Sequence, residues 1–323
     1  MLPRDPRGGP AVAVLMASVA RRYYLEGESK IDIALTLGIS RFKVARLLEQ
    51  AQASGIVRIE IVSPGSVDLA LSSRLQEAFA LRHCLVVSTA ETNPGALRQH
   101  VGRAAAELVS EIVTADDVLG LAWARSLAVM SSALTHLAAC EVVQLTGALQ
   151  RPDDEASSTE LVREVARVGG GPAHYFYAPM IVADASTADA LRRQPEVARS
   201  MGRLSKVTKA LVGIGSWEPG ASTVHDALAA KERQQLRRLG VTAEISGVLI
   251  DDQGRPVPAP LAARTIGVSA LQLNAIPDVV ALAYGGDKAR AVRAALISGL
   301  VKGLVTHSEL ASQLLATTQR RGG

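Results

Sequence analysis

The sequence predicts an α/β protein in which a mostly parallel sheet flanked by helices follows a small all-α winged helix-turn-helix domain. From residue 67 onward, short apolar runs alternate with long Ala/Leu-rich amphipathic segments, as in a parallel sheet covered on both faces. Residues 30–57 instead hold two short helical patterns joined at a glycine. The turn-forming run at 63–66, SPGS, separates the two regions. We therefore expect a domain at 1–63 and a second at 64–323.

A helix over residues 12–25 is predicted first, and the helix-turn-helix pattern follows it. In its first helix, Ile31, Ala34 and Leu37 recur at helical spacing, and Gly38 is placed to end that helix in a left-handed conformation. Ile39 is expected to be buried. The hydroxyl of the next residue is placed to cap a second helix, whose apolar stripe is formed by three residues: Val44, Leu47 and Leu48.

The second helix is of the right width for the major groove of DNA. Polar and basic residues lie on or beside its outer face, and the predicted DNA-binding set is Lys30, Ser40, Arg41, Lys43 and Arg46. The alternative is a small α-hairpin with a solvated basic face. Val57, Ile59 and Ile61 then alternate with charged residues, which predicts a short strand of a wing.

Bulk composition narrows the class of protein. The 323 residues are 48% hydrophobic and 20% charged, which is typical of a globular chain with a large core. No uncharged apolar run reaches the roughly 18 residues of a membrane span. Residues 1–63 hold 9 basic and 6 acidic residues, so most of the net charge of +4 lies with the helix-turn-helix, where a polyanion would bind. Cys84 and Cys140 have no metal-ligand spacing, the histidines are scattered, and we expect a cytoplasmic chain without metal or cofactor.

The second domain begins with a predicted helix over residues 69–79 and a strand at 84–87. Seven further strands are expected, at 118–122, 142–145, 176–182, 210–214, 245–250, 264–268 and 279–284. In parallel sheets ligands bind beyond the carboxyl ends of the strands. The strand-to-helix turns are therefore the places to search for a site.

Three such turns carry suitable chemistry. In GLAWARSL, residues 120–127, small residues lead to Arg125 and Ser126 at a helix start, which suits a phosphate, although strand-loop-helix units with one arginine are common. In QLTG, residues 144–147, Thr146 offers a hydroxyl. In YGGDK, residues 284–288, two glycines precede Lys288, a point charge suited to phosphate.

Taken together, these segments give the chain a family resemblance. The matching stretches are IALTLGISRFKVARLLEQAQASGIV, GLAWARSL, VVQLTGAL, LVGIGS, ISGVLIDDQGRPV and VVALAYGGDKARAVRAALISGLVKGLVTH. In this order the chain resembles the SorC family of bacterial transcriptional regulators. The resemblance implies an effector domain with a Rossmann-like fold similar to glucosamine-6-phosphate deaminase and ribose-5-phosphate isomerase, and a regulator of a carbohydrate-catabolism operon.

The resemblance also implies a site for a phosphorylated sugar or polyol. Its phosphate would be held by the first and last of the three turns, at Gly120, Trp123, Arg125, Ser126, Gly285, Gly286 and Lys288. The second turn would add Thr146 and Gly147. Acidic candidates for sugar hydroxyls are Glu244 and Asp251, with Asp226 weaker, although Asp251 in DDQG could equally serve a turn. Ala124 and Ala148 stand where the family often has glycine, and each methyl is expected to narrow the site.

Three functional hypotheses remain open at this stage. The first is a DNA-binding regulator, assembled as a homodimer or homotetramer, that binds operator DNA and a sugar-phosphate effector. The second is a sugar-phosphate isomerase or deaminase-like enzyme with an appended DNA-binding module, for which Glu244, Asp251 or the neighbours His225 and Asp226 would have to supply a base. The third is an oligomerisation scaffold without a ligand. No catalytic residue is predicted under the first hypothesis.

Overall fold

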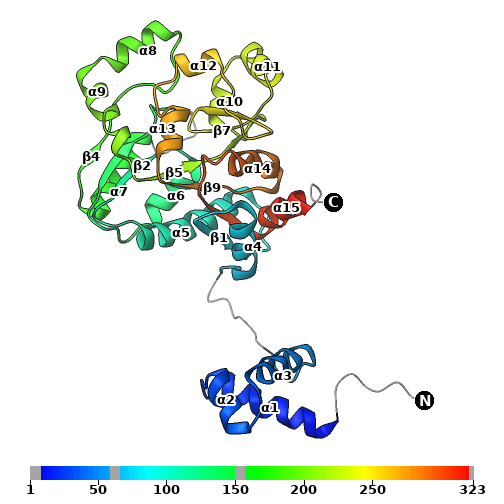
Figure 1. The fold of residues 1–323 in the computed structure, drawn as a ribbon. Coiled ribbons are helices and arrows are strands. Elements are labelled where there is room, and N and C mark those ends of the chain that lie inside the picture. The colour runs from blue at the N-terminus through cyan, green and yellow to red at the C-terminus, as the bar shows by residue number, and fades with distance from the viewer. Residues whose placement is uncertain (1–8, 59–65, 150–156, 320–323) are drawn as a thin grey trace. The chain divides into compact units, whose positions relative to one another are not determined.

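In the computed structural model, which describes residues 9–58, 66–149 and 157–319, the chain divides into two compact units, Met1–Val62 and Ser63–Gly323 (Figure 1). The expected wing strand at Ile59 and Ile61, and residues 63–65 of the expected boundary, lie outside the described residues.

The first unit consists of three helices, α1 (Pro10–Tyr24), α2 (Lys30–Leu37) and α3 (Arg41–Ala53). Ser29 Oγ accepts from the backbone N–H of Asp32, and Ser40 Oγ accepts from that of Lys43, so a hydroxyl caps each of the last two helices. Gly38 ends α2 at φ 63°, a conformation in which a side chain would be strained. The predicted cap and the predicted helix-ending glycine are confirmed.

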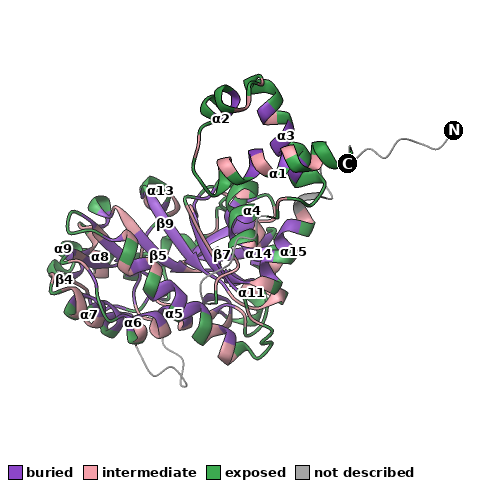
Figure 2. Ribbon diagram, turned by 90° about the horizontal axis from the view of Figure 1, so that it is seen from below, coloured by how far each residue is buried: buried purple, intermediate pink, exposed green. Residues whose placement is uncertain are grey.

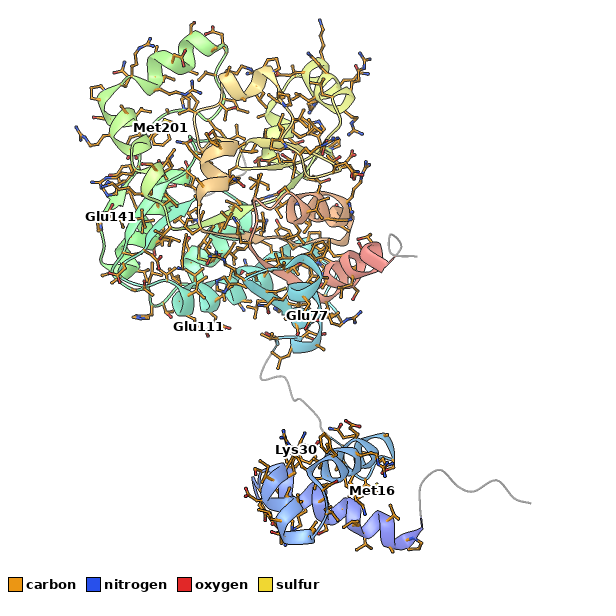
Figure 3. The ribbon with its side chains drawn as sticks, viewed as in Figure 1. Met16, Lys30, Glu77, Glu111, Glu141 and Met201 are labelled. Atoms are coloured by element: carbon orange, nitrogen blue, oxygen red, sulfur yellow. The ribbon has the colours of Figure 1, made fainter. Side chains whose placement is uncertain are left out.

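A small apolar core holds these three helices together. Met16 and Val19 of α1 (Figure 3 labels Met16) pack with residues of α2 and α3, where the buried side chains are Ile33, Ala34, Val44, Leu47, Leu48 and Ala51. Within α2 the buried isoleucine is Ile33, whereas Ile31 is 54% exposed. Ile39 is half-buried against this core rather than fully buried.

The second unit is built on a seven-stranded sheet in which every pair of neighbours is parallel. Its order is β1 (His83–Val87), β10 (Gly303–His307), β9 (Asp278–Leu282), β5 (Lys209–Gly213), β2 (Val118–Leu121), β3 (Glu141–Gln144) and β4 (Ala173–His174). The predicted α/β class with a mostly parallel sheet is confirmed. The sequence reasoning did not assign β10, although all five of its residues are buried.

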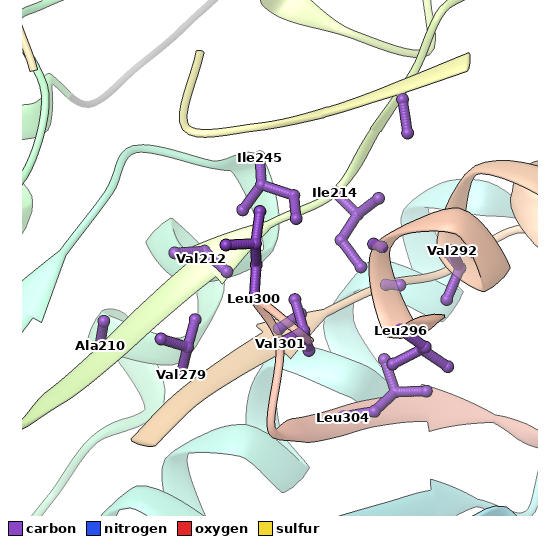
Figure 4. Close-up of a cluster of buried hydrophobic side chains, with 14 of the residues drawn as sticks. Ala210, Val212, Ile214, Ile245, Val279, Val292, Leu296, Leu300, Val301 and Leu304 are labelled. Carbon is purple, nitrogen blue, oxygen red and sulfur yellow. The ribbon is translucent and has the colours of Figure 1, made fainter. Parts of the chain in front are cut away.

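Both faces of the sheet are covered by helices, because successive side chains of a strand point to opposite faces. In β9, Val279 and Ala281 belong to one buried cluster, and Val280 and Leu282 belong to another. Figure 2 shows β9 and β5 as buried ribbons, and Figure 4 shows part of the first cluster. That cluster draws on α4 (Leu69–Phe79), α14 (Ala289–Ile297) and α15 (Ser308–Gln319); the second draws on α5 (Pro94–Ile112), α6 (Arg125–Ala133) and α7 (Ser158–Gly169).

A second, antiparallel sheet corrects the expected strand at 245–250. It contains β6 (Gly215–Ser216), β7 (Val241–Ile245) and β8 (Val248–Asp251). Ser246 and Gly247 have φ values of 55° and 85°, so the chain reverses there in a two-residue hairpin turn. The expected strand, ISGVLI, therefore contains a turn at its Ser-Gly pair, a turn signal that the strand assignment did not use.

Two other predicted strands are wrong. Residues 176–182 and 264–268 make only isolated bridges, Ala148 with Pro179, Ile181 with Thr265, and Thr146 with Gly267. Pro179 has no N–H to donate to a ladder, which keeps a regular strand from forming through it. The remaining elements are α8 (Ala185–Arg192), α9 (Pro195–Met201), η1 (Leu204–Lys206), α10 (Thr223–Ala227), α11 (Ala230–Arg238), α12 (Pro260–Ala263), α13 (Ala270–Ala275) and η2 (Gly286–Lys288).

Candidate functional site

A pocket lies beyond the carboxyl ends of four neighbouring strands, β9, β5, β2 and β3, where ligands of parallel sheets bind. It encloses about 680 Å³ of empty space, including the part open to solvent. The antiparallel sheet and the start of α10 provide residues of its wall. Its polar lining consists of Arg125, Ser126, Thr146, Ser222, Thr223, Glu244, Ser246 and Lys288.

Two cations line this pocket, one from each of two strand-to-helix turns. Lys288 ends the short η2 turn after β9, and its Nζ lies 5.3 Å from the ring centroid of Tyr284. Burial lowers the pKa of Lys288, and the positive charge of Arg125 lowers it further. Within the described residues, no carboxylate is in salt-bridge contact with either cation. An anion bound near both cations would offset the cost of burying the Lys288 charge and the repulsion between Lys288 and Arg125.

Arg125 is held in place by a chain of contacts through the loop after β6. Its Nη2 donates to the carbonyl of Gly220 at 3.2 Å, and the Gly220 N–H donates to Asp226 Oδ1 at 3.0 Å. His225 Nδ1 lies 3.0 Å from the same Asp226 oxygen. Asp226 therefore contacts Arg125 indirectly, by fixing Gly220, and does not line the pocket.

A buried carboxyl group also lines the pocket. Glu244 of β7 is 6% exposed; its Oε1 accepts from Ser222 Oγ at 2.9 Å and its Oε2 from the Gly247 N–H at 3.0 Å. Burial raises its pKa, because the charged form is poorly solvated there. Gly215 lies so close that a Cβ at that position would collide with Glu244 and Ser222.

The raised pKa of Glu244 gives a testable pH dependence. Above the ordinary pKa of 4.5, the unfolded chain loses a proton that the folded chain keeps, so the free energy of unfolding should fall as pH rises. The Glu244→Gln variant keeps an acceptor for Gly247 and lacks this proton. We expect its melting temperature, relative to wild type, to increase as pH rises above 4.5 and to level off once pH passes the folded-state pKa of Glu244. Parallel melting curves over that range would contradict the assignment.

The structure brings seven of the predicted effector residues to the pocket. These are Trp123, Arg125, Ser126, Thr146, Gly147, Glu244 and Lys288. Sequence reasoning missed Ser222, Thr223, Ser246 and Tyr284 among the lining residues. Ser222 caps α10 through the His225 N–H, a cap signal that could have marked this helix start.

Four predicted residues lie outside the pocket lining. A Cβ on Gly120 would meet Leu145 at 2.6 Å and Val207 at 2.9 Å, so this glycine is required by strand packing. Asp251 accepts from the N–H groups of Gln253 and Arg255 and thereby holds the turn after β8. Gly285 and Gly286 form the turn that leads to the pocket lysine.

A buried histidine, His307, accepts a hydrogen bond from the turn at Gly285. Gly285 has φ 92°, and its N–H donates to His307 Nε2 at 3.0 Å. The neighbouring Gly286 has no room for a side chain, because a Cβ there would meet Gln313 and Glu309 within 3 Å. The two glycines therefore shape the backbone that positions Lys288.

Gly147 has a packing role in addition to its place in the lining. A Cβ there would lie 2.7 Å from Ala178 O and from Met180 N, both backbone atoms that cannot move independently. We expect Gly147→Ala to lower the free energy of unfolding by about 1–3 kcal/mol, in the range of other overpacking substitutions. Chemical denaturation would measure this, and an unchanged midpoint would show that the segment at 178–180 adapts freely.

The two positions occupied by alanine differ in their effect. Ala124 lines the pocket, and its Cβ would lie 2.7 Å from a Cβ added to Gly213, so the glycine allows the segments after β2 and at the end of β5 to come close together. Ala148 is not among the lining residues; its N–H and carbonyl pair with Ala178 and Met180. The expected narrowing by Ala148 is therefore not seen.

The predicted DNA-binding residues lie at the start of α2 and α3 of the first unit. Ser40, Arg41, Lys43 and Arg46 are exposed, whereas Lys30 is partly covered, with its Nζ 5.5 Å from the Tyr23 ring centroid. Val44 and Leu47 of α3 are buried against the core. The cations of α3 thus occupy the face that the fold leaves open.

Two absences can be stated for the described part of the chain. No helix in it combines the length and the apolar character needed to cross a bilayer. Within the same residues, no cluster of three or more His, Cys, Asp or Glu side chains could hold a metal ion.

Comparison with known proteins places this architecture in a family. Residues 64–316 match the family described as "Putative sugar-binding domain". The transcriptional regulator LsrR of Klebsiella pneumoniae subsp. pneumoniae is 30% identical over 312 residues, covering 94% of this chain and 93% of that protein. The uncharacterized transcriptional regulator YjhU of Escherichia coli is 29% identical over 305 residues, covering 91% and 92%.

A solved structure shows the same fold. The full-length sorbitol operon regulator SorC from Klebsiella pneumoniae has a TM-score of 0.72 at 22% identity, covering 94% of this chain and 99% of that chain. These relatives are named as regulators of transcription and not as enzymes. The chain therefore belongs to the SorC family of transcriptional regulators, with a C-terminal sugar-binding domain.

Proposed function

We propose that this regulator binds operator DNA of a carbohydrate-catabolism operon through its first unit and is controlled by a phosphorylated sugar or polyol bound in the pocket. One observation carries the second part. Arg125 and Lys288 line one pocket together with hydroxyl groups and a carboxyl group, and among the described residues neither cation has a carboxylate in salt-bridge contact. A dianionic phosphate matches the two cations, and sugar hydroxyls match the polar wall.

The pocket offers groups suited to a charge and groups suited to hydroxyls. Arg125 and Ser126 begin α6, where the helix dipole also favours an anion, and Lys288 lines the same pocket. Glu244, which interacts electrostatically with Lys288, and the hydroxyl of Ser222 line it as well. Carboxyl and hydroxyl groups both form hydrogen bonds with sugar hydroxyls, so these residues would select among sugars of equal charge.

The first unit would supply the contact with operator DNA. The exposed start of α3 carries Arg41 and Lys43 beside the capping Ser40, in the position from which a recognition helix enters the major groove. We further propose that the protein acts in the cytoplasm as a homodimer or homotetramer, because two linked helix-turn-helix units match a two-fold operator and multiply affinity. Sedimentation of the full chain tests the assembly.

The contacts of the candidate bases do not favour the enzyme alternative. Asp251 holds a turn, and the ring of His225 packs edge-on against Trp217, with centroids 5.2 Å apart. Neither residue lines the pocket. Glu244 does, with each oxygen accepting one hydrogen bond, but the relatives of this chain are named as regulators and not as enzymes. The pocket itself argues against a scaffold without a ligand.

A thermal-shift screen of the full chain against phosphorylated and free sugars and polyols tests the effector. A ligand that binds only the folded state raises the melting temperature. At a ligand concentration 100 times its dissociation constant, it raises the free energy of unfolding by about 2.7 kcal/mol. We expect the phosphorylated compounds to act and their free counterparts to have little effect. Stabilisation by free sugars alone would contradict the phosphate assignment, and a panel without effect would support the scaffold.

A further inference from the structure

One large apolar side chain of the first unit, Phe42, belongs neither to the buried core nor to the cap of α3. Phe42, the second residue of α3, is 87% exposed. The chain has three phenylalanines, and the other two are covered by protein: Phe176 is 2% exposed and Phe79 packs against a core cluster. Its neighbours in sequence, Arg41 and Lys43, are the cations of the proposed DNA-binding set.

The geometry of α3 directs this ring away from the core of the first unit. A helix turns by about 100° per residue, so the buried Val44, Leu47 and Ala51 lie roughly 140–200° around the axis from Phe42. Arg46, one turn further along, lies on the same side as Phe42. Arg41 and Lys43 lie on either side of it. The outward face of the helix start is therefore an aromatic ring surrounded by three positive charges.

This arrangement matches the chemistry of one base. In the major groove, the C5-methyl of thymine is the apolar group presented at a base edge, and aromatic or aliphatic side chains contact it. Arginine and lysine beside the ring would meet phosphates or guanine and fix its register. We propose that Phe42 reads the methyl group of a thymine in each operator half-site. This inference rests on the proposed DNA-binding function and names its specificity-determining contact.

The position of Phe42 gives the ring no evident structural role. The hydrogen bond that caps α3 is made by Ser40, and phenylalanine is not among the stronger helix formers. The surrounding charges favour a polyanion as the occupant over an apolar protein surface. DNA can contact both, with its phosphates at the cations and a thymine methyl at the ring.

The test begins with duplexes selected from a random pool by the full-length protein. Each thymine of the selected site is then replaced, one at a time, by deoxyuridine, which lacks only the methyl. We expect wild type to bind about fourfold more weakly at one position per half-site, the effect of losing one buried methyl-sized contact. Phe42→Ala should bind the thymine duplex more weakly than wild type and be insensitive to uracil at that position.

A matched control is Leu35→Ala, since Leu35 of α2 is 78% exposed and belongs to the same unit. This variant should keep the uracil sensitivity of wild type. If no duplex is selected at all, the proposed function fails and the inference fails with it. If wild type binds selected DNA but no uracil substitution weakens it, or if Phe42→Ala keeps the same sensitivity, the inference alone is overturned. Because Phe42 is exposed, its variant should melt like wild type, and this is checked in parallel.

Discussion

Full-length protein carrying Arg41→Glu or Lys43→Glu is expected to bind its selected DNA about 100-fold more weakly than wild type, with unchanged affinity for the effector. Both side chains are exposed at the capped start of α3, so neither substitution disturbs the core of Met16, Val19 and Leu47. The loss arises because each substitution removes a cation and places a negative charge against the phosphates. Fluorescence anisotropy at several salt concentrations measures it, and the salt dependence should become shallower.

Arg21→Glu is the matched control for this experiment. Arg21 lies on α1 in the same unit, is 73% exposed at its side chain and pairs with Glu26 at the surface. It changes the net charge by the same amount, away from α3. Equal weakening by all three substitutions would mean that overall charge, and not the start of α3, determines binding. Loss of effector binding as well would mean that the two functions are not separable.

The second large effect is expected at the pocket. Lys288→Met and Arg125→Ala should each weaken binding of the phosphorylated effector by at least about 30-fold, since removing one partner of a buried charge contact costs about 2–5 kcal/mol. Isothermal titration with the compound found in the thermal-shift screen measures this. Affinity for the operator in the absence of effector should be unchanged, because the substitutions lie in the other unit.

The same lysine gives an independent stability readout. The folded-state pKa of Lys288 lies below its ordinary 10.5, so at neutral pH its charge opposes folding, and this cost disappears as pH rises through the lowered pKa towards 10.5. Lys288→Met should therefore fold at least as stably as wild type while losing the ligand. Arg290→Ala is the control, two residues further along the chain. The Arg290 side chain is exposed and pairs with Asp252, so this variant should keep the stability and the effector affinity of wild type. A destabilised Lys288→Met would show that the lysine is mainly structural.

Local signals in the sequence were enough for the elements that depend on local interactions. Gly38 and Ser40 each act on the backbone within a few residues, and their roles were predicted correctly. The alternation of apolar strands with helices likewise predicted the parallel sheet. It follows that Arg125, Thr146 and Lys288, each placed just after a strand, could be predicted to meet at one edge.

Errors arose where one pattern has two physical readings. Residues 245–250 were predicted as a single buried strand, but Ser246 and Gly247 adopt positive φ and form the turn of a hairpin. The apolar run at 176–182 contains Pro179, whose missing N–H leaves only isolated bridges. Periodicity reports which residues are apolar and says little about which backbone groups find a partner.

By itself, the sequence determined the order of the elements, the capped helix start with its cations, and the turns that carry Arg125 and Lys288. Only the tertiary structure decided that Ser222 donates to Glu244 across 22 residues, and that Gly220 supports Arg125 across 95. These contacts depend on side chains converging from separate elements, and such convergence leaves no periodic signal along the chain.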